Sequence, residues 1–152
     1  MISWQCKTFF ELTAEEAYKI LQLRSKIFVV EQNCVYQDCD NKDQEAFHLM
    51  AWENEHLVAY ARLLRPGISY PDAASIGRVC VSVSFRRKDF GKLLMNKSIE
   101  HIYRLFGPIS IKISAQLYLK HFYESFSFVQ LGNVYLEDGI AHILMRKYYS
   151  EW

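Results

Sequence analysis

A basic turn beside a predicted helix start is the most informative chemical feature of this sequence. Arg86, Arg87 and Lys88 form the turn, and Lys92 follows in the first helical turn. A helix start leaves backbone N–H groups unpaired and carries partial positive charge, so an anion such as a pyrophosphate binds there. The cations add charge-assisted hydrogen-bond donors at the same point. A solvated basic turn without a ligand is the alternative that this segment leaves open.

A second group of side chains has the chemistry needed to move protons. A phenol such as Tyr123, with an ordinary pKa near ~10, can share or donate a proton, and a carboxylate such as Glu31 can accept one. His142 and His48 are alternative bases, because imidazole titrates near neutral pH. Each has a structural alternative: Tyr123 is one of ten tyrosines that could pack in an aromatic core. The histidines could equally be hydrogen-bonded structural residues.

The cysteines show no metal-binding pattern. Cys6, Cys34, Cys39 and Cys80 contain no Cys-x-x-Cys pair, and no paired histidines accompany them. Zinc is therefore not expected. Disulfides are not expected in a reducing compartment either. The prediction is four small buried side chains, without a bound metal.

An acidic stretch, Asp38-x-Asp40-x-x-Asp43, superficially resembles a calcium-binding loop. It lacks the glycine and the closing glutamate at the spacing that such a loop requires. The interpretation is therefore a solvated or turn-forming acidic loop.

The first half of the chain predicts a helix, an irregular polar segment and a hairpin. The helix opens with Thr13-x-x-Glu16, a capping box in which each side chain satisfies a free N–H group at the other position. Apolar residues then recur at helical spacing. The two strands of the hairpin are joined by a short polar turn. The predicted bounds are 13–28 for the helix, 30–46 for the irregular segment, and His48–Trp52 and Leu57–Leu64 for the strands.

The second half alternates strands and helices. A helix that positions the basic turn stops at Gly107-Pro108, because this pair cannot continue it. Hairpins at the ends pair antiparallel and helical crossovers in the middle pair parallel, so the order indicates an α/β fold (α+β by some schemes) with a mixed sheet. The predicted strands are Ser75–Val83, Ile109–Ile113, Phe128–Leu136 and Ile140–Tyr148, and the predicted helices are Asp89–Phe106 and Gln116–Ser125.

Composition limits the classes of protein and partner. The 152 residues fit a single domain, 1–152, and 51% are apolar, enough for a self-sufficient core. Lys and Arg total 18 against 17 Asp and Glu, and this balance argues against a nucleic-acid partner. No apolar run reaches the ~20 residues that cross a bilayer, and the amino terminus lacks a secretory signal, so we expect no membrane partner and a cytoplasmic location. The aromatic carboxy terminus could support a homodimer.

The basic turn also resembles a family signature. Arg86 to Gly91 is similar to the [Gln/Arg]-x-x-Gly-x-[Gly/Ala] motif of the GCN5-related N-acetyltransferase (GNAT) superfamily, and Ile76–Val81 resembles the preceding strand. Residues 115–128 resemble another element of that family, with Gln116 near its start and Tyr123 seven residues later. Ser127-Phe128 stands there in place of Gly-Phe. The resemblance implies a GNAT fold: a mixed, mostly antiparallel sheet of about six to seven strands, about four flanking helices and a splay between the central parallel strands.

The resemblance also implies acetyl-CoA as the co-substrate. Backbone amides of the turn would hold the coenzyme A pyrophosphate, and main-chain groups of Val79 and Val81 would pair with the pantetheine arm and the thioester carbonyl. The implied cofactor-binding residues are Val79, Val81, Arg86, Arg87, Lys88, Asp89, Phe90, Gly91, Lys92, Gln116 and Phe122.

Asp89 departs from the family motif, because it stands where the first glycine is usual. A position shaped for glycine can require a positive φ, which Asp tolerates only partly. Asp also favours capping a helix, and a capping side chain would occupy N–H groups needed by the phosphate. The sequence therefore predicts weakened cofactor binding at this position and leaves its loss open.

A narrower resemblance covers nearly the whole chain. The run Leu23-Arg24-x-x-Ile27-Phe28-Val29-Val30-Glu31-Gln32-x-Cys34-x-Tyr36, the acidic stretch, and Glu137-Asp138-Gly139-Ile140-x-His142-Ile143-x-Met145 are similar to the ElaA-like branch of the superfamily. By that resemblance Glu31, Gln32 and Tyr36 bind the acceptor. Glu31 and His142 are the alternative bases, although Glu31 could instead pair with Arg24 or Arg78.

The resemblance implies an acetyl-CoA-dependent N-acetyltransferase. An amine of a small-molecule or peptide acceptor attacks the thioester directly, and Tyr123 protonates the departing thiol. The alternative is a non-catalytic acyl-CoA-binding or regulatory module. A third route, through a nucleophilic cysteine such as Cys80, lacks a paired histidine at recognisable spacing. The identity of the acceptor is not readable from the sequence.

Overall fold

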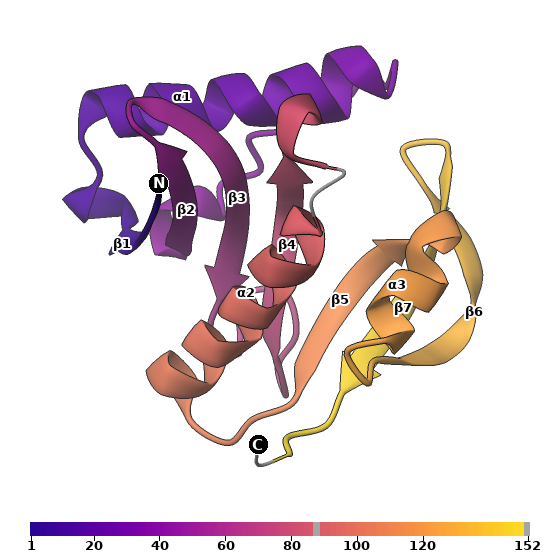
Figure 1. Ribbon diagram of the computed structural model, residues 1–152. Coiled ribbons are helices and arrows are strands. Elements are labelled where there is room, and N and C mark those ends of the chain that lie inside the picture. The colour runs from indigo at the N-terminus through magenta and orange to yellow at the C-terminus, as the bar shows by residue number, and fades with distance from the viewer. Residues whose placement is uncertain (87–88, 151–152) are drawn as a thin grey trace.

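The computed structural model of the chain consists of one mixed sheet with helices on both faces (Figure 1). It describes residues 1–86 and 89–150. Within them lie seven strands and three α-helices, against the six to seven strands and about four helices expected. The elements are β1 (Ile2–Thr8), α1 (Ala14–Arg24), β2 (Phe47–Glu53), β3 (His56–Leu64), β4 (Ala74–Val81), α2 (Phe90–Phe106), β5 (Ile111–Gln116), α3 (Lys120–Glu124), β6 (Val129–Glu137) and β7 (Ile140–Lys147).

The sheet has the strand order β1-β2-β3-β4-β5-β7-β6. Its neighbours pair antiparallel except β4 and β5, which are parallel, as the order of hairpins and crossovers predicted. The β4–β5 ladder contains only two pairs, Ala74↔Ile111 and Ser75↔Lys112. Both pairs lie where the strands begin, so the strands diverge towards Val81 and Gln116. This divergence is the predicted splay between the central parallel strands.

Alternation along the strands sends side chains to two cores. On β2, Leu49 and Ala51 pack on the α2 side, whereas Met50 and Trp52 pack with Leu23 and its neighbours on α1. Successive strand residues point to opposite faces, so one strand supports both layers. Buried residues of α3 join the same core as α2. In Figure 1, α1 accordingly covers one face of the sheet, and α2 and α3 cover the other.

The first helix, α1, ends earlier than predicted, but the helical segment as a whole runs further. The capping box is confirmed, because the Thr13 side chain accepts from the Glu16 N–H and the Glu16 carboxylate accepts from the Thr13 N–H. After Arg24 the chain continues as a π-helical turn, Ser25–Glu31, rather than ending at residue 28. Single π-helical turns are frequent at functional sites. The turn carries the Glu31–Gln32 pair out of the helix towards the carboxyl ends of the central strands.

Two elements differ from the prediction. β1 was not predicted, although Ile2, Trp4 and Cys6 alternate with polar residues, and its strand pairs with β2 along its whole length. Gln116 ends β5 instead of starting a helix; a 3₁₀ turn, Leu117–Leu119, and then α3 follow it. The β5–β7 pairing extends the strand to Gln116, because Gln116 is in register with His142.

β4 contains an irregularity next to the predicted cofactor residues. Tyr60 of β3 pairs with Cys80, and Arg62 pairs with Gly77, so β4 has one extra residue in this interval. Arg78 within it adopts φ 49°. A bulge of this kind re-aims side chains and interrupts pairing. It turns the Arg78 guanidinium towards the loop that follows α1.

Candidate functional site

The basic turn lies between β4 and α2, as predicted. Val81 ends β4, a 3₁₀ turn follows at Val83–Phe85, and α2 begins at Phe90. Lys92 is exposed in the first turn of α2. Arg87 and Lys88, two of the predicted phosphate-binding residues, lie outside the described residues. Among the described residues, Arg86 therefore lies before the start of α2 and Lys92 lies just after it.

Asp89 has the backbone conformation that its family position suggested. Its φ of 53° and ψ of 25° lie in the left-handed region, which glycine adopts at no steric cost. The expected cap is absent, because the Asp89 side chain makes no hydrogen bond to the first turn of α2. A capping residue normally has extended backbone angles, and the left-handed angles of Asp89 depart from that geometry. The expectation of a blocking cap is therefore wrong, and the Asp89 carboxylate does not occupy the N–H groups of the helix start.

Main-chain groups near the end of β4 fit a ligand that lies along the strand. The described β4–β5 pairs end at Ser75, so neither Val79 nor Val81 pairs with β5. Unpaired strand edges offer N–H and C=O groups to an extended chain, and an amide-containing arm such as pantetheine matches them. The Val81 carbonyl already accepts a hydrogen bond from Arg86 Nε at 3.0 Å.

Arg86 also contacts Glu31, one of the predicted acceptor-binding residues. Its Nη2 lies 2.8 Å from Glu31 Oε2, and the two side chains are 38% and 40% exposed. Glu31 therefore pairs with Arg86, and not with Arg24 or Arg78 as the sequence suggested. The ion pair links the end of the π-helical turn to the basic turn.

The start of α2 packs closely against α3. A Cβ atom at Gly91 would lie 3.8 Å from the Phe122 ring, an ordinary van der Waals contact. Phe90 is buried and stacks on Trp4 of β1, with ring centroids 5.7 Å apart. Two of the predicted cofactor residues, Gly91 and Phe122, are thus neighbours, and Phe90 anchors the helix start in the core.

Tyr123 lies in α3 with its side chain turned into the core. Its residue is 8% exposed, and its ring makes edge contacts with Phe122 and Phe128. Burial, and to a lesser degree Tyr118, raises the pKa of Tyr123 to about 12, above the ordinary value assumed from the sequence. At neutral pH the phenol is protonated and acts as a hydrogen-bond donor.

Gln32, Gln116 and His142 come together although they are far apart in sequence. Gln116 Nε2 donates to Gln32 Oε1 at 3.3 Å, and His142 is the cross-strand partner of Gln116. His142 is buried, and its Nδ1 lies 2.7 Å from the Ile140 carbonyl. Its Nε2 lies 3.4 Å from Glu137 Oε2. If the proton is on Nδ1, the Nε2 lone pair is the basic position of the ring.

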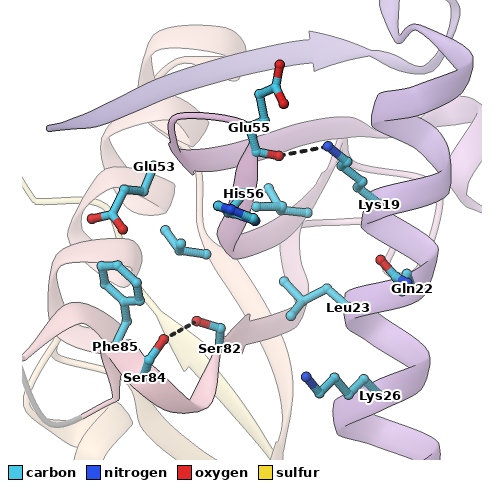
Figure 2. A pocket seen from close by; sticks show the side chains of 12 residues that line it. Lys19, Gln22, Leu23, Lys26, Glu53, Glu55, His56, Ser82, Ser84 and Phe85 are labelled. Carbon is cyan, nitrogen blue, oxygen red and sulfur yellow. Dashed lines mark hydrogen bonds between the residues drawn. The ribbon is translucent and has the colours of Figure 1, made fainter.

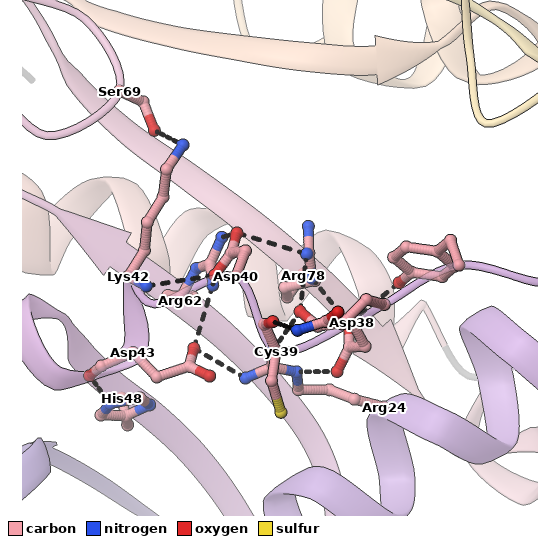
Figure 3. A network of polar contacts seen from close by, with 12 residues as sticks. Arg24, Asp38, Cys39, Asp40, Lys42, Asp43, His48, Arg62, Ser69 and Arg78 are labelled. Carbon is pink, nitrogen blue, oxygen red and sulfur yellow. Dashed lines mark hydrogen bonds and ion pairs between the residues drawn. The ribbon is translucent and has the colours of Figure 1, made fainter.

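The acidic stretch is not a solvated loop, so that part of the expectation was wrong, whereas the turn-forming alternative is confirmed: Asp40 Oδ1 accepts from the Lys42 N–H, and Asp43 begins a 3₁₀ turn. Its three carboxylates pair with three arginines from α1, β3 and β4 (Figure 3). Arg24, which is fully buried, contacts Asp38 at 2.8 Å and Asp43 at 2.9 Å. The remaining contacts are Arg62 with Asp40 at 2.7 Å and with Asp43 at 2.9 Å, and Arg78 with Asp38 at 2.8 Å and with Asp40 at 3.4 Å.

The three carboxylates and three arginines form what we call the Asp–Arg network. This network also makes contacts with Tyr36 and His48. Tyr36 donates to Asp38 Oδ1 at 2.9 Å, and Arg78 lies 5.7 Å from the Tyr36 ring centroid. His48 Nδ1 lies 2.7 Å from the Tyr60 hydroxyl and its Nε2 lies 2.9 Å from the Asp43 carbonyl, so both ring nitrogens have partners. Burial lowers the pKa of His48. His48 is therefore a structural residue and not a base.

One signal for this network was present in the sequence. Arg24 occupies an apolar face of the predicted helix, and Arg62 sits in an otherwise apolar strand. Charged residues at core positions require partners, and the nearby acidic stretch offered them. Among the described residues no group of three or more His, Cys, Asp or Glu side chains could hold a metal ion.

The cysteines follow the prediction in part. All four are free thiols, and Cys34 and Cys80 are buried, but Cys39 is exposed. Burial raises the pKa of Cys80 to about 12, so its thiol is protonated at neutral pH. A thiolate is the nucleophilic form, and this argues against Cys80 as a nucleophile.

A cavity of about 470 Å³ is lined in part by the 82–85 segment that precedes the basic turn, and neither Tyr123 nor Gln116 is among its lining residues (Figure 2). α1, the β2–β3 hairpin and the 82–85 segment enclose it. Lys26 points into the cavity, and Ser82 and Ser84 lie within hydrogen-bonding reach of each other at 3.4 Å. Its lining residues are Lys19, Gln22, Leu23, Lys26, Glu53, Glu55, His56, Leu57, Val58, Ser82, Ser84 and Phe85.

The model of the family described as "Acetyltransferase (GNAT) domain" matches residues 12–149. The protein ElaA of Escherichia coli (strain K12) is 42% identical over 149 residues, which cover 97% of each chain. The crystal structure of an acyl-CoA N-acyltransferase from Pseudomonas aeruginosa is 41% identical, has a TM-score of 0.92 and covers 97% of this chain and 99% of that one.

A more distant solved structure is similar in fold alone. It is an aminoglycoside 6'-N-acetyltransferase complexed with coenzyme A. It is 18% identical, has a TM-score of 0.68 and covers 97% of this chain and 96% of that one.

None of the helices among the described residues has the length and apolar character of a membrane-spanning segment.

Proposed function

The chain belongs to the GNAT acetyltransferase family, and from this premise we propose that it transfers an acetyl group from acetyl-CoA to the amine of an acceptor. One observation carries the proposal. The edge of β4 beyond its pairs with β5 leads to the start of α2, where Gly91 lies beside Phe122, the chain neighbour of the buried Tyr123. A strand edge, an anion-binding helix start and a phenol are the groups that an acyl-CoA thioester requires.

Acetyl-CoA would supply a thioester carbonyl as the electrophile and a thiolate as the leaving group. Backbone N–H groups at the start of α2, together with Arg86 and Lys92, bind the pyrophosphate in this proposal. The main-chain groups of Val79 and Val81 orient the pantetheine arm. The solved aminoglycoside acetyltransferase of the same fold was crystallised with coenzyme A, which supports this choice of ligand.

Tyr123 holds its proton on Oη and donates a hydrogen bond towards the negative charge that develops on sulfur. A free thiol has a pKa near ~8.5, so complete proton transfer from a phenol with a pKa of about 12 costs roughly 5 kcal/mol. Tyr123 therefore acts by sharing its proton, and the final protonation of the thiolate can come from solvent.

His142 is the base that we favour. Its cross-strand position beside Gln116 places the ring next to the Gln32–Gln116 contact, where the acceptor would bind. Its Nδ1 contact with the Ile140 carbonyl favours the tautomer with an unprotonated Nε2, which lies 3.4 Å from Glu137 Oε2, a carboxylate oxygen that would stabilise a proton taken up there. Glu31 is held by Arg86, so we assign it to charge recognition in place of proton removal. Gln32 lines the acceptor side in this proposal, whereas Tyr36 supports the loop through Asp38.

Calorimetry with acetyl-CoA tests the proposal, followed by thiol-release assays with a panel of amines. The proposal predicts saturable binding and amine-dependent release of free coenzyme A. Absence of binding at millimolar acetyl-CoA would refute it. Binding without thiol release across the panel would favour the second candidate, a non-catalytic acyl-CoA-binding or regulatory module. Asp89, in place of glycine, is the residue that keeps this second candidate open.

Self-association and location remain parts of the proposal. Tyr148 is 58% exposed near the carboxy terminus, whereas the Tyr149 ring already packs on Tyr103 of the same chain. A homodimer through this surface predicts a mass near twice 18.0 kDa in sedimentation. A monomer at all concentrations would exclude it.

The cytoplasmic location is tested by fractionating cells.

A further inference from the structure

Arg86 is a charged side chain that touches both the proposed cofactor half and the proposed acceptor half of the site. Its Nε donates to the Val81 carbonyl at 3.0 Å, and its Nη2 pairs with Glu31 Oε2 at 2.8 Å. Val81 belongs to the strand edge assigned to the pantetheine arm. Glu31 is the last residue of the π-helical turn that leads into the acceptor loop.

These two contacts compete with the phosphate role of Arg86. A guanidinium has five N–H groups in a fixed planar fork. While Nε and Nη2 serve Val81 and Glu31, the same N–H groups cannot also serve an anion at the start of α2. Without Arg86, the Val81 carbonyl and the Glu31 carboxylate would be free to accept hydrogen bonds from a bound ligand. Three N–H groups remain, but the Nε and Nη2 edge and the charge of Arg86 are already engaged, so a phosphate that binds this edge displaces Val81 and Glu31.

We propose that Glu31 and the cofactor phosphate compete for Arg86, and that this competition couples cofactor binding to recognition of a cationic acceptor. The inference rests on the proposed function. When Arg86 turns to the phosphate, the Glu31 carboxylate becomes free to pair with an ammonium group. An ammonium that pairs with Glu31 releases Arg86 in the same way, because coupling between two sites is reciprocal. The acceptor class is thus an amine that binds in its protonated, cationic form.

The size of the effect follows from the exposure of the ion pair. Glu31 and Arg86 are 40% and 38% exposed, so solvent screens the pair strongly. Half-exposed ion pairs of this kind change an equilibrium by up to about fivefold. Higher salt weakens the pair further and reduces the effect.

Calorimetric titration of coenzyme A into the wild type and Glu31→Gln tests the proposal without an acceptor. We expect Glu31→Gln to lower the Kd about two- to fivefold at low salt, because Arg86 no longer has a competing carboxylate. Glu45→Gln is the matched control, since Glu45 forms an exposed pair with Arg65, at 3.1 Å, outside the site. It removes the same charge and should leave the Kd unchanged.

A double-mutant cycle separates coupling through Arg86 from the general loss of a negative charge. Arg86→Gln should weaken binding, and Glu31→Gln should bring no further gain in that background. An equal gain in both backgrounds, or no gain in the wild type, would overturn the coupling. If no variant binds coenzyme A, the proposed function fails and the inference fails with it.

Discussion

Tyr123 shows how burial adjusts a residue that sequence alone marks as a proton donor. The pKa of about 12 keeps the phenol protonated and makes it a weaker acid than a free tyrosine. Its ring packs edge-on against Phe122 and Phe128, which restricts the positions of the hydroxyl group. Fixed donors aimed at developing charge contribute to the reaction rate more than to ground-state binding.

Tyr123→Phe therefore should lower the rate of thiol release about 10²-fold or more and change the Kd for acetyl-CoA little. Tyr118→Phe is the matched control, because Tyr118 is 74% exposed in the neighbouring turn. Stopped-flow thiol detection and calorimetry supply the two measurements. An unchanged rate in Tyr123→Phe would remove this residue from the mechanism.

At Asp89, a residue other than glycine occupies a left-handed backbone conformation that only glycine adopts at no steric cost. A non-glycine residue in the left-handed region costs about 1 kcal/mol, less for Asp than for most. The free energy of unfolding of Asp89→Ala should therefore be about 1 kcal/mol lower than that of Asp89→Gly, measured by urea denaturation. Loss of the carboxylate should also tighten coenzyme A binding in both variants. Equal stability of the two variants would show that the backbone here does not require a positive φ.

At the scale of elements, the Asp–Arg network ties the loop after α1 to β3 and β4. Asp43 is buried and joins two arginines, since its Oδ1 accepts from both Arg24 and Arg62. Breaking a buried ion pair leaves an uncompensated charge in the core, which costs much more than an exposed pair contributes. The network therefore supports the loop that carries the predicted acceptor residue Tyr36, and it is sensitive to the loss of one member.

We expect Asp43→Asn to lower the free energy of unfolding by about 3–5 kcal/mol, measured by urea denaturation. Asp72→Asn is the control, because Asp72 also contacts two cations, Lys112 and Arg146, but is exposed. That change should cost less than about 1 kcal/mol. Similar losses in the two variants would contradict the role of burial.

The same network predicts acid sensitivity. Burial raises the pKa of the Asp40 carboxyl, but hydrogen bonding and charge from Arg62 and the charge of Arg78 outweigh it, and the pKa falls from 3.8 to about 2. The unfolded chain takes up this proton first, so the stabilisation is full above pH ~5 and is lost as pH falls from about 4 to about 2. It amounts to about 2 kcal/mol.

Urea denaturation of Asp40→Asn at pH 5 and pH 2 measures this contribution. The wild type should lose up to about 2 kcal/mol more than the variant between the two pH values, because the variant has no proton to gain at residue 40. The same loss in both proteins would assign the acid sensitivity to other groups.

At the scale of the whole molecule, two parts of the sheet meet through a short ladder. β1–β4 form one part and β5–β7 the other, and only two residue pairs join β4 to β5. A ligand that bridges the diverging edges would add contacts between them. In the proposed function, the divergence interrupts the sheet where the cofactor binds.

Acetyl-CoA at 100 times its Kd should raise the free energy of unfolding by about 2.7 kcal/mol. Urea denaturation with and without the ligand gives this value, and hydrogen exchange should slow at the ends of β4 and β5. Inorganic pyrophosphate serves as the control, since it fits the turn but cannot bridge the strands. Equal protection of β4 and β5 by pyrophosphate would contradict the bridging role of the ligand.

The sequence by itself determined the features that depend on neighbouring residues. The strand, basic turn and helix over 75–106 follow from local patterns, and so does the capping box at Thr13 and Glu16. The order of hairpins and crossovers also determined that β4 and β5 are parallel. β1 carried an alternating pattern as well, but seven residues at a chain end acquire a partner only when β2 is in place.

Only the tertiary structure decided which distant side chains meet. Gln32 and Gln116 are 84 positions apart, and Glu31 pairs with Arg86 where spacing offered Arg24 and Arg78. Such choices depend on the π-helical turn, the bulge at Arg78 and the β5–β7 register, which packing fixes together. The acidic stretch changed from a solvated loop to a buried ion network for the same reason: burial and partners belong to the folded chain and not to the local sequence.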